Sequence, residues 1–295
     1  MRLRDLEPGD VDAVVRRVRD ALADDHAHNP LISPKIDTAT LAASLRATRE
    51  SCLVAEEGDA IVGHLYGVAL ASDDGRDAWT GPDGWSGASE VASRLRETAY
   101  ERWRASGVRA HHAWVRDDPT TIAAWLTQGY RVMDVRGLLA LGASDEGGLE
   151  LCRRSDVALA LHFDVLIDAA NDESPPRGRA RRTRRQALHE LLEDADTTQY
   201  VFERDGMALA QCIAFALEPT RATPLRTLHL SAVAVEPAAR RQGLARGLVE
   251  AVLIEGASQG FTHAQVTWRP DNEAASHLWR AMGFRPTYAH LVAML

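Results

Sequence analysis

The chain has 295 residues, of which 45% are hydrophobic and 26% charged, so it is neither a disordered nor a collagen-like protein. Its formal net charge of −8 argues against general nucleic-acid binding, which favours a basic surface. The sequence has neither an apolar run of roughly 18 residues nor an apolar signal core near its N-terminus, so we expect a cytoplasmic protein without a membrane partner. Three scattered cysteines predict neither a disulfide framework nor a metal site.

Apolar periodicity and turn residues predict alternating helices and strands along the whole chain. In the first half we expect helices over 10–24, 38–50, 88–106 and 118–128, a hairpin over 51–70, and strands over 109–116 and 130–141. The stretch 73–87 is polar and predicts a loop, and the Gly-rich acidic segment 142–148 predicts a linker. In the second half we expect helices over 156–170, 180–194, 243–258 and 272–282, a hairpin over 199–217, and strands over 230–235, 262–269 and 284–295.

An internal repeat relates the two halves. The segments 114–131 and 268–285 align without a gap, with five identities and one aromatic exchange, Tyr130 for Phe284. We therefore predict an α/β (α+β) fold built twice, as domains 1–142 and 149–295, each a mixed central β-sheet flanked by helices.

The strongest local signal is a strand, a basic turn and a helix start. The apolar run 230–235 ends at Pro237, and Arg240, Arg241 and Gly243 precede an amphipathic helix. Amides in the first turn of a helix have no internal partner, so such a turn binds anionic oxygens. Glycine and arginine allow close approach and add positive charge, which predicts a pyrophosphate site.

Two motifs carry a family resemblance. Arg240-x-x-Gly243-x-Ala245 resembles the acyl-CoA loop of the GNAT superfamily of N-acyltransferases, and the run from Asn272 to Phe284 resembles its second signature. The sequence lacks the glycine pattern of a dinucleotide fold and of a Walker loop. With the repeat, the chain looks like a tandem GNAT protein with a degenerate first half, an architecture similar to mycothiol synthase-type proteins.

The resemblance implies acetyl-CoA, or another acyl-CoA, as co-substrate and no metal. It implies that backbone groups of one strand pair with the pantetheine arm, that the turn from Arg241 to Arg246 holds the pyrophosphate, and that Asn272 bonds the pantetheine or acyl end. The implied cofactor-binding residues are Val233, Ala234, Val235, Arg240, Arg241, Gln242, Gly243, Leu244, Ala245, Arg246, Asn272, Ser276 and Trp279. The strands on either side are expected to splay apart to admit the thioester.

The catalytic base and acid are less strongly indicated. His229 lies where many GNAT enzymes carry a base, and histidine as a residue type ordinarily titrates near neutrality. We therefore predict His229 as the base, against the alternative of a surface or core histidine. Glu236 is the second candidate. The family's usual acid is a tyrosine, but Trp279 stands there and an indole donates no proton. Water, Tyr288 or Ser276 could protonate the thiolate instead, or the domain binds acyl-CoA without turnover. A large side chain packed in the core is the structural alternative for Trp279.

The first half does not keep the turn. With a one-residue gap, Glu90 aligns with Gly243 and the arginines are absent, so we expect this half to bind no CoA and to shape the acceptor pocket. Three further features have open interpretations. The run Arg177–Arg185 is a solvated segment or an anion site. The segment Asp24–Pro30 is a loop or pocket wall rather than a metal site. His111 and His112 point to opposite faces of a strand, and the tryptophans of this half are core or pocket residues.

We therefore predict an acetyl-CoA-dependent N-acyltransferase acting on a small-molecule primary amine by direct transfer. A protein N-terminus or lysine as acceptor, and a non-catalytic acyl-CoA sensor or scaffold, are the alternatives. The expected partners are the amine acceptor and no nucleic acid. Because two fused halves supply the pairing that single domains obtain by dimerising, we expect a monomer or weak homodimer.

Overall fold

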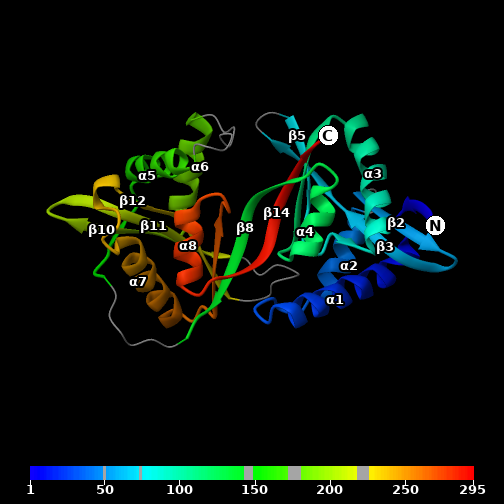
Figure 1. The fold of residues 1–295 in the computed structure, drawn as a ribbon, viewed down its shortest axis with the longest axis horizontal. Helices are drawn as coiled ribbons and strands as arrows, with labels where there is room; N and C mark the ends of the chain where they lie inside the picture. Colours follow the sequence, from blue (N-terminus) through cyan, green and yellow to red (C-terminus); the bar gives the residue numbers. More distant parts are fainter. Residues whose placement is uncertain (49–50, 73–74, 143–148, 172–180, 218–225) are drawn as a thin grey trace. The chain divides into compact units, whose positions relative to one another are not determined.

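The computed structural model describes residues 1–48, 51–72, 75–142, 149–171, 181–217 and 226–295 (Figure 1). The chain forms two compact units. Unit 1 comprises the described residues of 1–135 and 286–295, and unit 2 comprises those of 136–285. The domain boundary predicted at 142–149 stays a prediction, because residues 143–148 lie outside the described part.

Unit 1 contains two groups of strands. One sheet has the order β1-β2-β3-β6, from Arg2–Asp5, Cys52–Glu57, Ala60–Tyr66 and Trp85–Ser86. The other strands follow the order β4-β5-β7-β14, from Val68–Ser72, Gly75–Thr80, Val108–Arg116 and Arg285–Met294. The helices are η1 (Pro8–Asp10), α1 (Val11–His28), α2 (Thr38–Ala47), α3 (Ser89–Ala105) and α4 (Pro119–Leu126).

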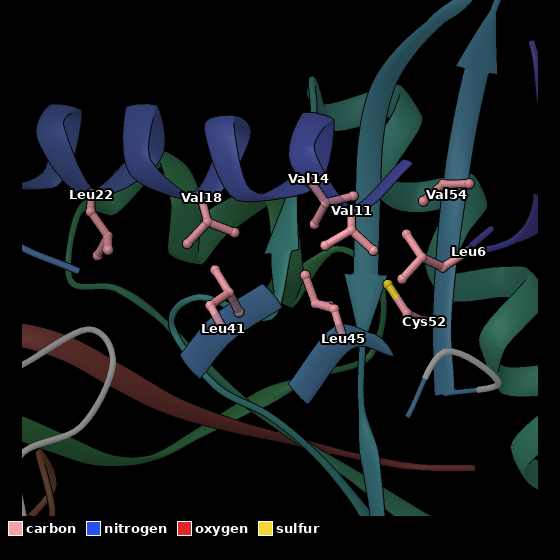
Figure 2. Close-up of a cluster of buried hydrophobic side chains, with 9 residues drawn as sticks. All are labelled: Leu6, Val11, Val14, Val18, Leu22, Leu41, Leu45, Cys52 and Val54. Atoms are coloured by element: carbon pink, nitrogen blue, oxygen red, sulfur yellow. The ribbon is translucent and has the colours of Figure 1, made fainter. Parts of the chain in front are cut away.

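The core of unit 1 forms on both faces of β2, because alternate strand residues point to opposite sides. Cys52 and Val54 pack with α1 and α2 (Figure 2). Leu53 and Ala55 pack with α3 on the other face. In Figure 2 the buried residues of α1 lie on one side of the helix: Val11, Val14, Val18 and Leu22. Their three- and four-residue spacing is the apolar pattern that predicted this helix.

Unit 2 contains the strand order β13-β12-β11-β10-β9, from His263–Trp268, Thr227–Val235, Met207–Leu217, Thr197–Arg204 and Cys152–Arg154. The end of β8 (Arg131–Ala140) runs beside β13. The helices are α5 (Val157–Ala170), α6 (Arg181–Glu193), η3 (Pro237–Ala239), α7 (Leu244–Ser258) and α8 (Glu273–Ala281).

Two helical layers cover the sheet of unit 2. Helices α5 and α6 bury Ala160 and Leu188 against Ile213. Helix α7 lies against Leu228 through Gly256, where an added Cβ would come within 2.7 Å of the leucine side chain. The prediction of a mixed α/β fold with sheets flanked by helices is confirmed.

The last strand of the chain belongs to unit 1. From Tyr288 to Met294, β14 pairs antiparallel with β7, and the end of β8 lies beside β13 in unit 2. Unit 1 therefore contains β14, which comes at the end of the second half of the sequence. Unit 2 contains the end of β8, which comes at the end of the first half.

The secondary structure predicted for one segment of unit 1 was wrong. The stretch 73–87, expected to be a polar loop, contains β5 and β6. β5 pairs antiparallel with β4 and parallel with β7, and it buries Ala78 and Thr80. Charged residues at Arg76 and Asp77 conceal a strand in which only alternate side chains are buried.

Candidate active site

The parallel strands β12 and β13 separate part of the way along their lengths. Their register pairs run from Thr227 with His263 to Leu230 with Val266. β12 continues to Val235 and β13 to Trp268, but no register pair between these two strands follows in the described chain, whereas β12 stays paired with β11 on its other side. This edge of β12 therefore has backbone donors and acceptors available to an added strand or extended ligand. The splaying expected at this place is confirmed.

A β-bulge in β12 lies at the point of separation. Ser231 pairs with Ile213 and Ala234 with Gln211, so one extra residue of β12 is accommodated between them. Ala232 takes a positive φ of 48°, which is rare for a residue with a Cβ. Bulges bend a strand and increase its twist. The bulge therefore explains why β12 turns away from β13 after Leu230.

The turn after β12 presents a run of free amides. Arg241 and Gly243 have φ values of 61° and 79°, and Gly243 is the N-cap of α7. After the Arg240 amide, which donates to Pro237, the next backbone amide with an internal acceptor is that of Gly247, which donates to Gly243 at 3.0 Å. Among the described residues, no acceptor is found for the backbone amides from Arg241 to Arg246. Six consecutive donors at a helix start form an anion cradle.

The arginines of the turn have different roles. Arg240 donates from Nε to the Val235 carbonyl at 3.1 Å, so it closes the turn. Arg246 lies 3.5 Å from Glu250 one helical turn away, and both are exposed. Arg241 is also exposed. An added Cβ at Gly243 would have no atom within 4 Å, so space beside the cradle is open. The sequence alone did not separate Arg240 from its neighbours.

His229 lies on the part of β12 that is still paired. Its Nδ1 is 3.3 Å from Nε2 of Gln265, and its ring is 4.9 Å from that of Phe215. Burial, and to a lesser extent the positive charge of Arg136, lower the pKa of His229 to about 4. The imidazole is therefore neutral at pH 7, with its lone pair on Nδ1 facing the Gln265 amide, and it is a weaker base than an ordinary histidine.

The other acid–base candidates have protein partners. Glu236 bonds to His162 of α5. Ser276 accepts from Trp268 Nε1 at 3.1 Å and donates to the Pro270 carbonyl at 3.3 Å. Tyr288 lies in unit 1, where its hydroxyl donates to Asp25 at 3.2 Å.

The signature residues of α8 hold the helix in place. Asn272 accepts from the Ala275 amide at 3.0 Å as the N-cap, and its Nδ2 donates to Asn171 at 3.0 Å. Trp279 is 5% exposed and packs edge-on against Phe284 at 5.3 Å. This burial favours the structural interpretation of Trp279 and leaves it little surface for a cofactor.

The parallel strands β5 and β7 of unit 1 correspond to β12 and β13 of unit 2, but they do not separate in the same way. β5 pairs with β7 up to Thr80 and Ala113, where β5 ends. Helix α3 has Ala88 as its N-cap, so Ala88, and not Glu90 as the sequence alignment suggested, occupies the place of Gly243. The side chain of Val91 fills the space beside Gly63, where an added Cβ would lie 2.5 Å from its Cγ1.

Some predicted features lie outside this description. Residues 177–180 of the arginine-rich run are outside the described residues, as are the side chains of 181–184. In the described part of the chain, no helix is long and apolar enough to span a membrane, and no group of three or more His, Cys, Asp or Glu could hold a metal ion.

Comparison with known proteins places the fold. A GCN5-related N-acetyltransferase from Sphaerobacter thermophilus superposes with a TM-score of 0.63 at 13% identity, covering 99% of this chain and 95% of that one. A tandem GNAT protein from the clavulanic acid biosynthesis pathway gives 0.53 at 16% identity, covering 99% and 98%. A GNAT-family acetyltransferase from Colwellia psychrerythraea gives 0.51 at 15% identity, covering 100% of both chains. At these identities the likeness establishes the fold alone.

Residues 164–284 match the acetyltransferase (GNAT) family. The chain therefore carries a GNAT acetyltransferase domain, of a family that transfers acyl groups, and the resemblance seen in the two motifs is confirmed for this domain. No match was found among curated proteins.

Proposed function

We propose that this chain is an acetyl-CoA-dependent N-acetyltransferase that acylates a small-molecule primary amine by direct transfer. The observation that carries the proposal is the row of free amides from Arg241 to Arg246 beside the unpaired edge of β12. The free amides suit a pyrophosphate, and the unpaired edge of β12 suits an extended chain that carries amide groups. Coenzyme A has both in this order.

The cofactor contacts follow from these two features. The backbone of Val233, Ala234 and Val235 hydrogen-bonds the pantetheine arm as an added strand would. The amides of the turn hold the pyrophosphate, and the exposed side chains of Arg241 and Arg246 add positive charge. Arg240 supports the turn from inside through the Val235 carbonyl.

The thioester supplies an activated acyl carbon, and the protein must supply a neutral amine. An ordinary amine of pKa near 10 is about one part in a thousand neutral at pH 7, so its proton must be removed. His229, neutral on the paired part of β12, takes this proton directly or through water. The nitrogen–carbon bond forms as the carbon–sulfur bond breaks, and the thiolate leaves to be protonated by water, since Trp279 cannot donate a proton.

The acceptor is proposed to be cationic before transfer, for example a polyamine or an amine-bearing secondary metabolite. A chain with a net charge of −8 attracts cations, although net charge acts on encounter rather than on the pocket. The test is thiol release from acetyl-CoA with a panel of spermidine, kanamycin and a lysine-containing peptide, with the acetylated product identified by mass spectrometry. Amine-dependent thiol release supports the proposal, and acetylation of the peptide alone moves it to a protein acceptor.

Trp279 at the family's tyrosine position favours a second function, a non-catalytic acyl-CoA sensor. A sensor binds CoA at the same turn, so CoA raises the melting temperature in both cases. The two functions differ in turnover. Binding of CoA without amine-dependent thiol release for any member of the panel would favour the sensor, and the absence of CoA binding would reject both.

A further inference from the structure

A ladder of aromatic and histidine side chains lies on one face of the strands of unit 1. Trp79 of β5 stacks on His112 of β7, with ring centroids 4.1 Å apart and planes within 10°. His290 of β14 stacks on Trp114 at 4.9 Å. Each pair consists of register partners, so the four side chains share a face. His111, the neighbour of His112, lies on the other face, where Nε2 contacts Thr80 Oγ1 at 2.9 Å.

The two histidines of this ladder are hydrogen-bonded to each other and to a carboxylate. Nδ1 of His290 lies 3.1 Å from Oδ2 of Asp134, and Nε2 of His290 lies 3.0 Å from Nδ1 of His112. A carboxylate only accepts, so His290 carries its proton on Nδ1. When both rings are neutral, Nε2 of His290 accepts from His112, and His112 carries its own proton on Nδ1.

This chain of bonds leaves Nε2 of His112 as a lone pair. It faces Oδ2 of Asp77, 3.9 Å away. Burial lowers the pKa of His112 to about 4, which keeps this ring neutral near pH 7. Two acceptors therefore face each other across a gap that a shared donor fills, since one atom can lie ~2.8 Å from both.

The two facing groups are partly exposed, and the Asp77 carboxylate gives the site negative charge. The side chains of Asp77 and His112 retain 15% and 17% exposure. In the described part of the chain, no Lys or Arg ion pair with Asp77 is found, and no third ligand completes a metal site. A group with several N–H donors and a positive charge satisfies the carboxylate and the imidazole together, and the neighbouring Trp79 favours a cation further.

We propose that Asp77 and His112 form a binding site for a primary ammonium group, held in unit 1 by the His112–His290–Asp134 chain. His290 and Asp134 are positioning residues, because they act through the tautomer of His112. The site takes an organic amine in its charged form. It does not depend on the function proposed for unit 2.

The full-length protein is titrated at pH 8 with n-butylammonium chloride, and in parallel with tetramethylammonium chloride, which has the charge but no N–H donor. Binding is followed by the ¹⁵N shifts of labelled histidine side chains, with His112 assigned by loss of its signals in His112→Asn. We expect n-butylammonium to shift the Nε2 signal of His112 and tetramethylammonium to bind at least about tenfold more weakly.

Asp77→Asn is the decisive variant, because its amide supplies the missing donor to Nε2. It is expected to raise the melting temperature by about 2–4 °C and to weaken n-butylammonium binding at least about tenfold. Asp59→Asn, the same change in an exposed turn, is the matched control and should alter neither property. A gain in stability also shows that the variant folds.

Three results would overturn the proposal. The free protein at pH 8 could show His112 protonated at Nε2. Tetramethylammonium could bind the wild type as tightly as n-butylammonium does. n-Butylammonium could also bind Asp77→Asn as tightly as it binds the wild type. CoA binding is measured on the same samples, so loss of the unit 2 function is distinguished from loss of this site.

Discussion

Leu230 of β12 and Val266 of β13 are the last register partners of two parallel strands that both continue beyond them. In unit 1, the corresponding partners are Thr80 and Ala113, and there β5 ends. The opening that could admit an extended cofactor is therefore present in unit 2 between its strands and absent between β5 and β7. This contrast is the physical basis for expecting one cofactor site per chain.

Gly243→Ala tests the cradle directly. Its φ of 79° makes any Cβ strained, and the Cβ would enter the open space beside the free amides. We expect a loss of about 1 kcal/mol in the free energy of unfolding and a CoA affinity at least about tenfold lower. Urea unfolding and calorimetric titration measure the two effects.

Gly206→Ala is the matched control. It has a φ of 74° in the turn between β10 and β11, and its Cβ also has no atom within 4 Å. It should lose similar stability without changing CoA affinity. Equal loss of affinity in both variants would show that general destabilisation, and not the cradle, weakens binding.

Ala232 tests the bulge. A β-branched residue is a severe outlier at a φ of 48°, whereas glycine takes this conformation freely. We expect Ala232→Val to lose about 1–3 kcal/mol and to abolish CoA binding as β12 changes register, with Ala232→Gly close to the wild type. Binding retained by Ala232→Val would show that the strands separate for another reason.

His229→Gln tests the proposed base. Because the pKa of His229 is lowered to about 4, the ring is neutral from pH 6 to 8 and contributes no rate inflection near 6.5. The rate of acyl transfer should rise with pH as the acceptor loses its proton. The substitution should lower kcat by about 10²–10⁴-fold without changing the CoA affinity. An unchanged kcat would remove His229 from the mechanism.

The buried histidines predict acid sensitivity. Burial lowers the pKa of His64 to about 4 and that of His111 to about 3, so the unfolded chain binds protons before the folded one. Their stabilisation is complete above pH 6.5 and falls as pH decreases towards 4. Each group contributes a slope of up to about 1.4 kcal/mol per pH unit.

Urea unfolding at pH 7, 6, 5 and 4 measures this slope. His64→Asn should make the free energy of unfolding less dependent on pH, whatever the stability of the variant at pH 7. His277→Asn, a change at an exposed position of α8, is the control and should leave the slope unchanged. A stability that is independent of pH over this range would contradict the neutral buried state of these rings.

The sequence predicted the features that depend on local pattern. The helices follow the spacing of apolar residues, as in α1, and the turn from Arg240 to Ala245 combines glycine with the start of an amphipathic helix. The repeat was visible because Trp, Gly and Arg recur at identical spacing, and the same spacing locates α4 and α8.

What the sequence concealed depends on long-range pairing. β5 has charges at Arg76 and Asp77 and is a strand because β4 and β7 pair with it on both sides. The bulge needs an alanine at positive φ, for which composition offers no signal. β14 belongs to unit 1 because it pairs with β7, and the pattern of apolar residues in β14 does not reveal this partner.

The most direct test of the cofactor site is calorimetric titration of acetyl-CoA into the full chain, compared with the Gly243→Ala and Gly206→Ala variants. We predict one site per chain in the wild type and in Gly206→Ala, and at least about tenfold weaker binding in Gly243→Ala. Two sites per chain, or binding that Gly243→Ala leaves unchanged, would contradict the account.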